Sequence, residues 1–145
     1  MATRGAIGLR NEDQSITAVY LHWDSYPNWA GRTLLNHYDH NKTQQLLNLG
    51  AVSSLGSEIG EQHSMKNVYK SDDPRKNWCT FYTRDRGDQL QAAQTFASEK
   101  EFVENFRESW CEYFYVLEEC GTWFVNDRSS NHWQKVEDVL KEENS

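Results

Sequence analysis

Aromatic side chains are the feature that most constrains the fold of this chain. Its 145 residues include six Trp, seven Tyr and six Phe, although only 37% are hydrophobic and the mean hydropathy is −0.88. Each large ring can remove about 150–250 Å² of surface from water, so these rings have to supply the core. Disordered chains are depleted in aromatics, and at this length we expect one folded domain over residues 1–145.

Apolar runs are short throughout the sequence. None approaches the roughly 20 residues that cross a bilayer, and the first residues contain no apolar stretch of signal-peptide length. We therefore expect no membrane association and a location in the cytoplasm. The cysteines Cys79, Cys111 and Cys120 have no C-x-x-C spacing, so we expect reduced, buried thiols.

The formal net charge of −7 is unevenly distributed. Residues 1–98 contain ten acidic and ten basic side chains, whereas residues 99–145 contain twelve acidic and five basic ones. Such a field repels nucleic-acid phosphates and attracts basic partners. We therefore expect no direct nucleic-acid binding and a protein partner that is basic at the contact; a merely solubilising surface is the alternative. The predicted contact residues are acidic side chains of two expected helices: Glu101, Glu104, Glu108, Glu137 and Asp138.

Local patterns in the first half predict two strands, two helices and a loop. Residues 4–10 and 15–23 form a hairpin pattern around a polar turn. Apolar residues at helical spacing predict a helix over about 28–38. Asn41 with Gln44 resembles a capping pair for a short helix that Gly50 ends. The polar residues at about 53–77 predict a long loop.

The second half predicts three strands and two helices. Residues 78–84 alternate as a strand, and Ser98 with Glu101 forms a capping box for an amphipathic helix. Residues 111–118 and 122–126 predict a second hairpin around Gly121. Ser130 or Asn131 can cap a last helix with Trp133 facing inward. This order predicts an α+β fold, with a mainly antiparallel sheet built from two hairpins plus a further strand and with helices packed on one face.

Histidines and carboxylates suggest a metal site. On a strand His22 and Asp24 share one face, and at a helix end His37 and His40 lie one turn apart. Two imidazoles and a carboxylate are competent zinc or iron ligands. The spacing is generic, however, and a histidine near a helix C-terminus also interacts favourably with the helix dipole.

A second cluster of residues suggests a phosphorylated ligand. Gly and Ser can form a backbone nest for phosphate, and paired arginines beside Tyr82 offer cations next to a stacking ring. Neither common phosphate loop is present, so a solvated loop is the alternative. The candidate ligand-binding residues are His22, Trp23, Asp24, Tyr26, Ser54, Gly56, Arg84 and Arg86.

Residues 20–27 read Y-L-H-W-D-S-Y-P, and residues 31–38 and 46–56 continue the pattern. This resembles a group of small phage and prophage proteins with Y-x-H-W-D-G-Y-P, then G-x-x-L-L-x-x-Y and L-x-x-L-G-x-x-S-x-L-G. The match covers about residues 4–60, and Ser25 stands where the pattern has Gly. The resemblance implies a phage origin and action inside the infected host, by binding a host protein or a signalling molecule.

The sequence therefore leaves three functions open. The first is a phage accessory protein that binds and modulates a host protein in the host cytoplasm, in host takeover or counter-defence, without catalytic residues or a cofactor. The second is a small-molecule binder that sequesters a nucleotide-type signal. The third is a metal-dependent hydrolase that uses the histidines and Asp24.

Overall fold

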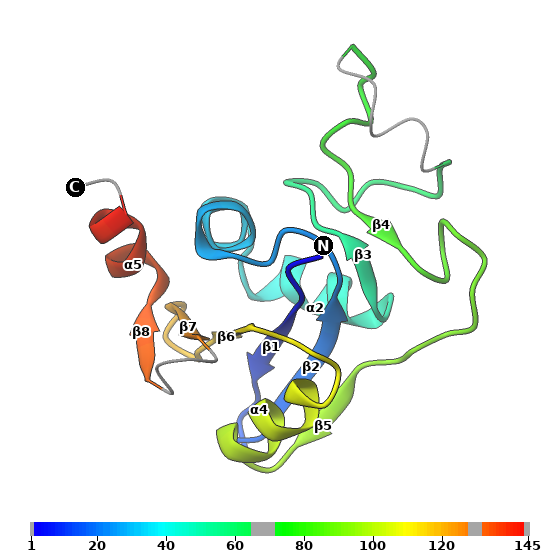
Figure 1. Ribbon diagram of the computed structural model, residues 1–145. Coiled ribbons are helices and arrows are strands. Elements are labelled where there is room, and N and C mark those ends of the chain that lie inside the picture. The colour runs from blue at the N-terminus through cyan, green and yellow to red at the C-terminus, as the bar shows by residue number, and fades with distance from the viewer. Residues whose placement is uncertain (1, 65–71, 128–131, 144–145) are drawn as a thin grey trace.

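A computed structural model describes residues 2–64, 72–127 and 132–143 (Figure 1). Its strands are β1 (Gly5–Arg10), β2 (Ile16–Leu21), β3 (Val52–Ser54), β4 (Thr80–Phe81), β5 (Gln94–Phe96), β6 (Tyr113–Leu117), β7 (Trp123–Asp127) and β8 (Trp133–Lys135). Its helices are α1 (Arg32–His37), α2 (His40–Asn48), α4 (Glu99–Arg107) and α5 (Val136–Glu143), and a π-type turn, η1 (Pro27–Gly31), precedes α1.

The strands form one mixed sheet in the order β4-β3-β2-β1-β6-β7-β8, and β5 pairs with part of β2. The β1–β2 and β6–β7 pairs are antiparallel, as the hairpin patterns predict. β1 and β6 pair in parallel, which joins the two hairpins at the centre of the sheet. The predicted α+β class and mainly antiparallel sheet are confirmed.

Both faces of the sheet are covered, because alternate residues of each strand point to opposite sides. Ile7, Val19 and Tyr115 pack with α1, α2 and α5 in one buried cluster. Ala6, Ala18 and their neighbours pack in a second cluster with the apolar face of α4 (Figure 1). The prediction that the helices pack on one face is therefore wrong. An amphipathic pattern shows that a helix buries one side, but not which face of the sheet it covers.

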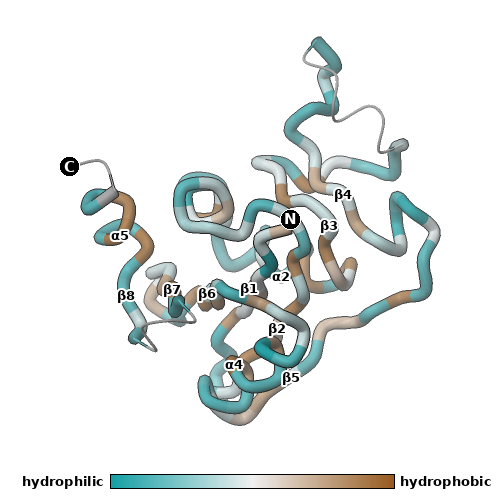
Figure 2. Tube along the Cα trace, viewed as in Figure 1, coloured by the Kyte–Doolittle hydropathy of each residue, from teal (hydrophilic) through white to brown (hydrophobic). Residues whose placement is uncertain are grey.

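Aromatic rings supply much of the core, as the composition predicts. Tyr115, Phe81, Phe102 and Phe114 are fully buried. Figure 2 shows hydrophobic residues concentrated along the central strands and hydrophilic ones at the connections. Within the described ranges, no helix is long and apolar enough to span a bilayer.

Helix ends follow their local signals with one exception. The Ser98 side chain accepts a hydrogen bond from the backbone of Glu101 at the start of α4, and Gly50 has a positive φ of 83° after α2. The cap of α2 is Asp39, which accepts from the backbone N–H of Lys42, and not Asn41.

Three predicted segments differ from the observed ones. The segment 53–77 begins within β3, and Glu58 bridges Trp78, so its described part is tied to the sheet. The strand expected at 78–84 is only two residues long, because the chain turns to bring Asp85 back to the backbone N–H of Phe81. Trp133 lies in β8 and not in the last helix, which begins at Val136; Ser130 and Asn131 lie outside the described residues.

Candidate functional site

The hollow around Arg10 is the first candidate site. Arg10 ends β1, Glu118 follows β6, Phe124 lies in β7 and Trp133 in β8. Strand alternation points these side chains to the face that α4 covers, where Glu99 at the start of α4 joins them. The volume of the hollow is about 240 Å³. We call it the Arg10 hollow, and it is lined by Arg10, Glu99, Val116, Glu118, Phe124 and Trp133.

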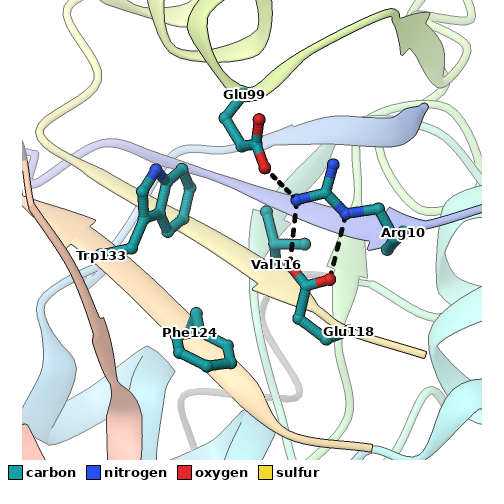
Figure 3. Close-up of a pocket in the computed structure, with 6 residues that line it drawn as sticks. All are labelled: Arg10, Glu99, Val116, Glu118, Phe124 and Trp133. Carbon is teal, nitrogen blue, oxygen red and sulfur yellow. Dashed lines mark hydrogen bonds and ion pairs between the residues drawn. The ribbon is translucent and has the colours of Figure 1, made fainter. Parts of the chain in front are cut away.

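Arg10 is held between two carboxylates (Figure 3). Its Nε and Nη2 donate to the two oxygens of Glu118, each at 3.0 Å, in a bidentate pair. Nη2 also donates to Glu99, and Nη1 donates to the backbone oxygen of Gln14 at 2.8 Å. All three guanidinium nitrogens are therefore occupied within the protein.

The two carboxylates are more exposed than the arginine. The side chain of Arg10 is 8% exposed, whereas those of Glu99 and Glu118 are 45% and 27% exposed. Hydrogen bonding to Glu118 raises the pKa of Arg10, and the backbone N–H of Glu99 together with Arg10 lowers the pKa of the Glu99 carboxyl. By formal charge, two carboxylates around one guanidinium leave one excess negative charge at the hollow.

The opposite wall of the hollow is apolar. Trp133 and Phe124 stand across from Arg10, and Val116 lies between them and the ion pairs (Figure 3). The Trp133 ring stacks on Phe102 of α4, with ring centroids 6.5 Å apart and planes inclined by 19°. This contact fixes the indole where β8 meets the α4 side of the sheet.

Two further hollows adjoin the Arg10 hollow and share Trp133. One, of about 450 Å³, runs along α4 and includes Glu104 and Asn126. The other, of about 600 Å³, runs toward α5 and includes Asp138. Glu104 and Asp138 are thus the two predicted partner-binding residues that border this region.

The other three predicted partner-binding carboxylates lie outside these hollows. Glu101 accepts from the backbone N–H of Ala97, Glu108 caps the end of α4, and Glu137 pairs with Lys141 at 3.3 Å. Because α4 and α5 pack on opposite faces of the sheet, the five acidic residues do not form one continuous patch.

Arg84 belongs to a buried network and not to an open ligand site. Its guanidinium pairs with Asp85 at 3.0 Å and donates to the backbone oxygens of Ile59, Gly60 and Cys79. Asp85 also accepts the backbone N–H groups of His63 and Phe81, and its side chain is fully buried. The predicted role of Arg84 in binding phosphate is therefore replaced by a structural one.

The remaining predicted ligand-binding residues are divided. The His22 ring contacts both Trp23 and Tyr82, and the Arg86 guanidinium lies over the Tyr82 ring. Asp24 has a positive φ of 55°, and its carboxylate is 3.5 Å from the Tyr26 hydroxyl.

Ser54 and Gly56 lie apart from these rings, on β3 and the segment after it. Gly56 packs so closely that an added Cβ would lie 2.1 Å from the backbone oxygen of Asn77. Its lack of a side chain is therefore explained by packing, with no need for a phosphate.

The predicted metal ligands are not gathered. His22 Nδ1 is 2.8 Å from the Tyr20 hydroxyl, and His40 Nε2 is 3.0 Å from the backbone oxygen of Glu118. Among the described residues, no three His, Cys, Asp or Glu side chains lie close enough together to hold a metal ion.

The cysteines differ from one another. Cys79 and Cys111 are buried, and burial raises the pKa of both thiols, that of Cys111 to about 12. Cys120 is exposed, contrary to prediction, and hydrogen bonding with Thr122 lowers the pKa of its thiol.

The residues of the Arg10 hollow were not identified from the sequence. Arg10 and Glu118 are 108 positions apart, and only the parallel β1–β6 pairing brings them together. The period-two alternation of β1 and β6 predicts on which face of the sheet each side chain lies. It does not predict which strands are neighbours. Searches against family models, curated proteins and solved structures find no match to this chain.

Proposed function

We propose that this chain binds a partner protein by taking one basic side chain of that partner into the Arg10 hollow. The observation that carries this function is the pair of partly exposed carboxylates of Glu99 and Glu118 around a single, fully engaged guanidinium. A carboxylate has about four acceptor sites, so lone pairs of both groups stay open to a second cation.

The size of the hollow suits a side chain. Its volume of about 240 Å³ lies below the roughly 300–1,000 Å³ of small-molecule pockets. A lysine or arginine can lay its aliphatic stem against Trp133 and Phe124 and point its charged end at Glu99. Charge and shape therefore favour a basic residue over an acidic or bulky apolar one.

The biological setting follows from the sequence resemblance. We place the protein in the cytoplasm of a phage-infected host, where it binds and modulates a host protein without catalysing a reaction. The acidic C-terminal third supports this setting, because excess negative charge speeds the encounter with a basic partner.

Nuclear magnetic resonance titration tests the proposed pocket. N-acetyl-arginine methylamide and N-acetyl-lysine methylamide should shift the indole N–H signal of Trp133 in a saturable manner, and added salt should weaken binding. N-acetyl-norleucine methylamide has a similar stem without the charge and should bind much more weakly. Equal shifts from the three compounds, or no shift at Trp133, would overturn the proposal.

A further inference from the structure

Four rings gather where β2 ends, at the opposite end of β1 from the Arg10 hollow. His22 lies at the centre: its ring centroid is 4.7 Å from that of Trp23, 5.9 Å from Tyr20 and 6.4 Å from Tyr82. Trp23 meets His22 edge to face, at 88°. We call these four residues the His22 cluster. The six-residue strand β1 separates it from Arg10 by about 17 Å, at about 3.4 Å per residue.

One arginine, Arg86, lies against this cluster. The Arg86 guanidinium lies 5.0 Å from the centre of the Tyr82 ring. Burial and the charges of Arg4 and Arg86 lower the pKa of His22, so the imidazole is neutral at neutral pH. Asp88 faces Arg86 at 3.6 Å, but both side chains are well exposed, so that ion pair is weak.

The exposed parts of the cluster are held on a rigid backbone. The N–H of His22 donates to Val52 and that of Trp23 donates to Ser53, which extends β2 along β3. The Tyr20 hydroxyl and His22 Nδ1 lie 2.8 Å apart. Trp23 nevertheless stays 39% exposed, and the Arg86 side chain 38%. A ligand would therefore meet an indole whose backbone is already ordered.

We propose that the His22 cluster binds a nucleoside monophosphate, whose base stacks on Trp23 and whose phosphate pairs with Arg86. Every base has a face that stacks on an aromatic ring, and a guanidinium matches phosphate geometry with two hydrogen bonds. A single nucleotide is favoured over a nucleic-acid strand, because the net charge of −7 repels a long polyanion, whereas one guanidinium can pair with one phosphate.

Isothermal titration calorimetry tests the ligand class. The probes are the four ribonucleoside 5′-monophosphates, their nucleosides, ribose 5-phosphate and a 12-nucleotide single-stranded oligonucleotide. At least one monophosphate should bind, and its nucleoside and ribose 5-phosphate should each bind at least tenfold more weakly. Absence of binding by all four monophosphates would overturn the proposal. Binding of the oligonucleotide without binding of any monophosphate would replace it with a nucleic-acid surface.

Matched variants test the position of the site. Trp23→Ala and Arg86→Gln should each weaken monophosphate binding roughly tenfold, because the first removes the stacking face for the base and the second removes the cation for the phosphate. Trp29→Ala and Arg32→Gln remove an exposed Trp and a partly exposed Arg from η1 and α1, which pack on the other face of the sheet, and should leave binding unchanged. Thermal unfolding confirms that each variant is folded. Equal weakening of binding by the two pairs of variants would contradict the assignment of the site to the His22 cluster. Glu99→Gln should leave monophosphate binding unchanged and affect only the Arg10 hollow.

Discussion

Arg10 and Arg84 both have their guanidinium groups fully engaged, yet they lie in different kinds of site. The carboxylate partner of Arg84 is Asp85, whose side chain has no exposed surface and whose oxygens accept two backbone N–H groups. The carboxylate partners of Arg10 are Glu99 and Glu118, both partly exposed beside an apolar hollow. The exposure of the anion, and not the engagement of the cation, therefore separates the buried Arg84–Asp85 ion pair from the proposed binding site at Arg10.

The largest effect is expected from breaking the buried network. Asp85→Ala leaves the Arg84 guanidinium and two backbone N–H groups without their acceptor. Loss of one partner of a buried pair costs about 3–5 kcal/mol, and we expect the free energy of unfolding to fall by that amount. Urea-induced unfolding of the wild type and the variant measures this loss of free energy.

Glu118→Ala is the matched change at the exposed network. Arg10 keeps Glu99 and the backbone oxygen of Gln14 as acceptors, and we expect a loss of only about 0–1 kcal/mol. Equal losses of stability for the Asp85 and Glu118 variants would contradict the distinction between the two arginines.

A smaller effect is expected at the edge of the buried network. The Tyr38 hydroxyl donates to the backbone oxygen of Gly56 at 2.8 Å and lies 3.1 Å from Cys79 Sγ. Tyr38→Phe should lower the free energy of unfolding by about 1–2 kcal/mol, because the Gly56 oxygen loses a buried donor. Tyr26→Phe, which removes an exposed hydroxyl, should cost less than about 0.5 kcal/mol in the same unfolding experiment. Similar costs for both variants would show that the Tyr38 bond does not support the network.

The fold could be predicted from sequence where the signals are local. The two hairpins, the Ser98 cap and Gly50 follow from alternation, side-chain chemistry and backbone freedom within a few residues. The helical spacing of Trp133 with Val136 fits a helix equally well, so β8 could not be recognised. The parallel pairing of β1 with β6 joins residues more than 100 positions apart and has no local signal.

For the candidate sites too, local features could be predicted from the sequence, whereas contacts between distant segments could not. His22, Trp23 and Arg86 were predicted as ligand-binding residues because aromatic and basic side chains follow one another in the sequence. The meeting of His22 and Arg86 at Tyr82 depends on the position of β4 beside β3, which composition cannot reveal. The Arg10 hollow was missed because its lining comes from five separate elements and the segment after β6.

The smallest effect concerns pH. Because the pKa of Glu99 is lower in the folded protein, its stabilisation is complete above the unfolded value of about 4.3 and is lost as the pH falls through the folded pKa. The difference in unfolding free energy between the wild type and Glu99→Gln should therefore shrink as the pH is lowered from 6 to 3. Urea unfolding at several pH values measures this, and a difference that grows on acidification would contradict the assigned charge of Glu99.

The most direct measurement of the central claim is the dissociation constant of N-acetyl-arginine methylamide for two matched variants. Glu99→Gln and Glu101→Gln make the same change of charge within the first turn of α4, but only Glu99 lines the Arg10 hollow. We expect Glu99→Gln to weaken binding about tenfold, equivalent to about 1.4 kcal/mol, and Glu101→Gln to change it less than about twofold. Equal weakening by both variants, or none by Glu99→Gln, would show that the hollow is not a site for a basic side chain.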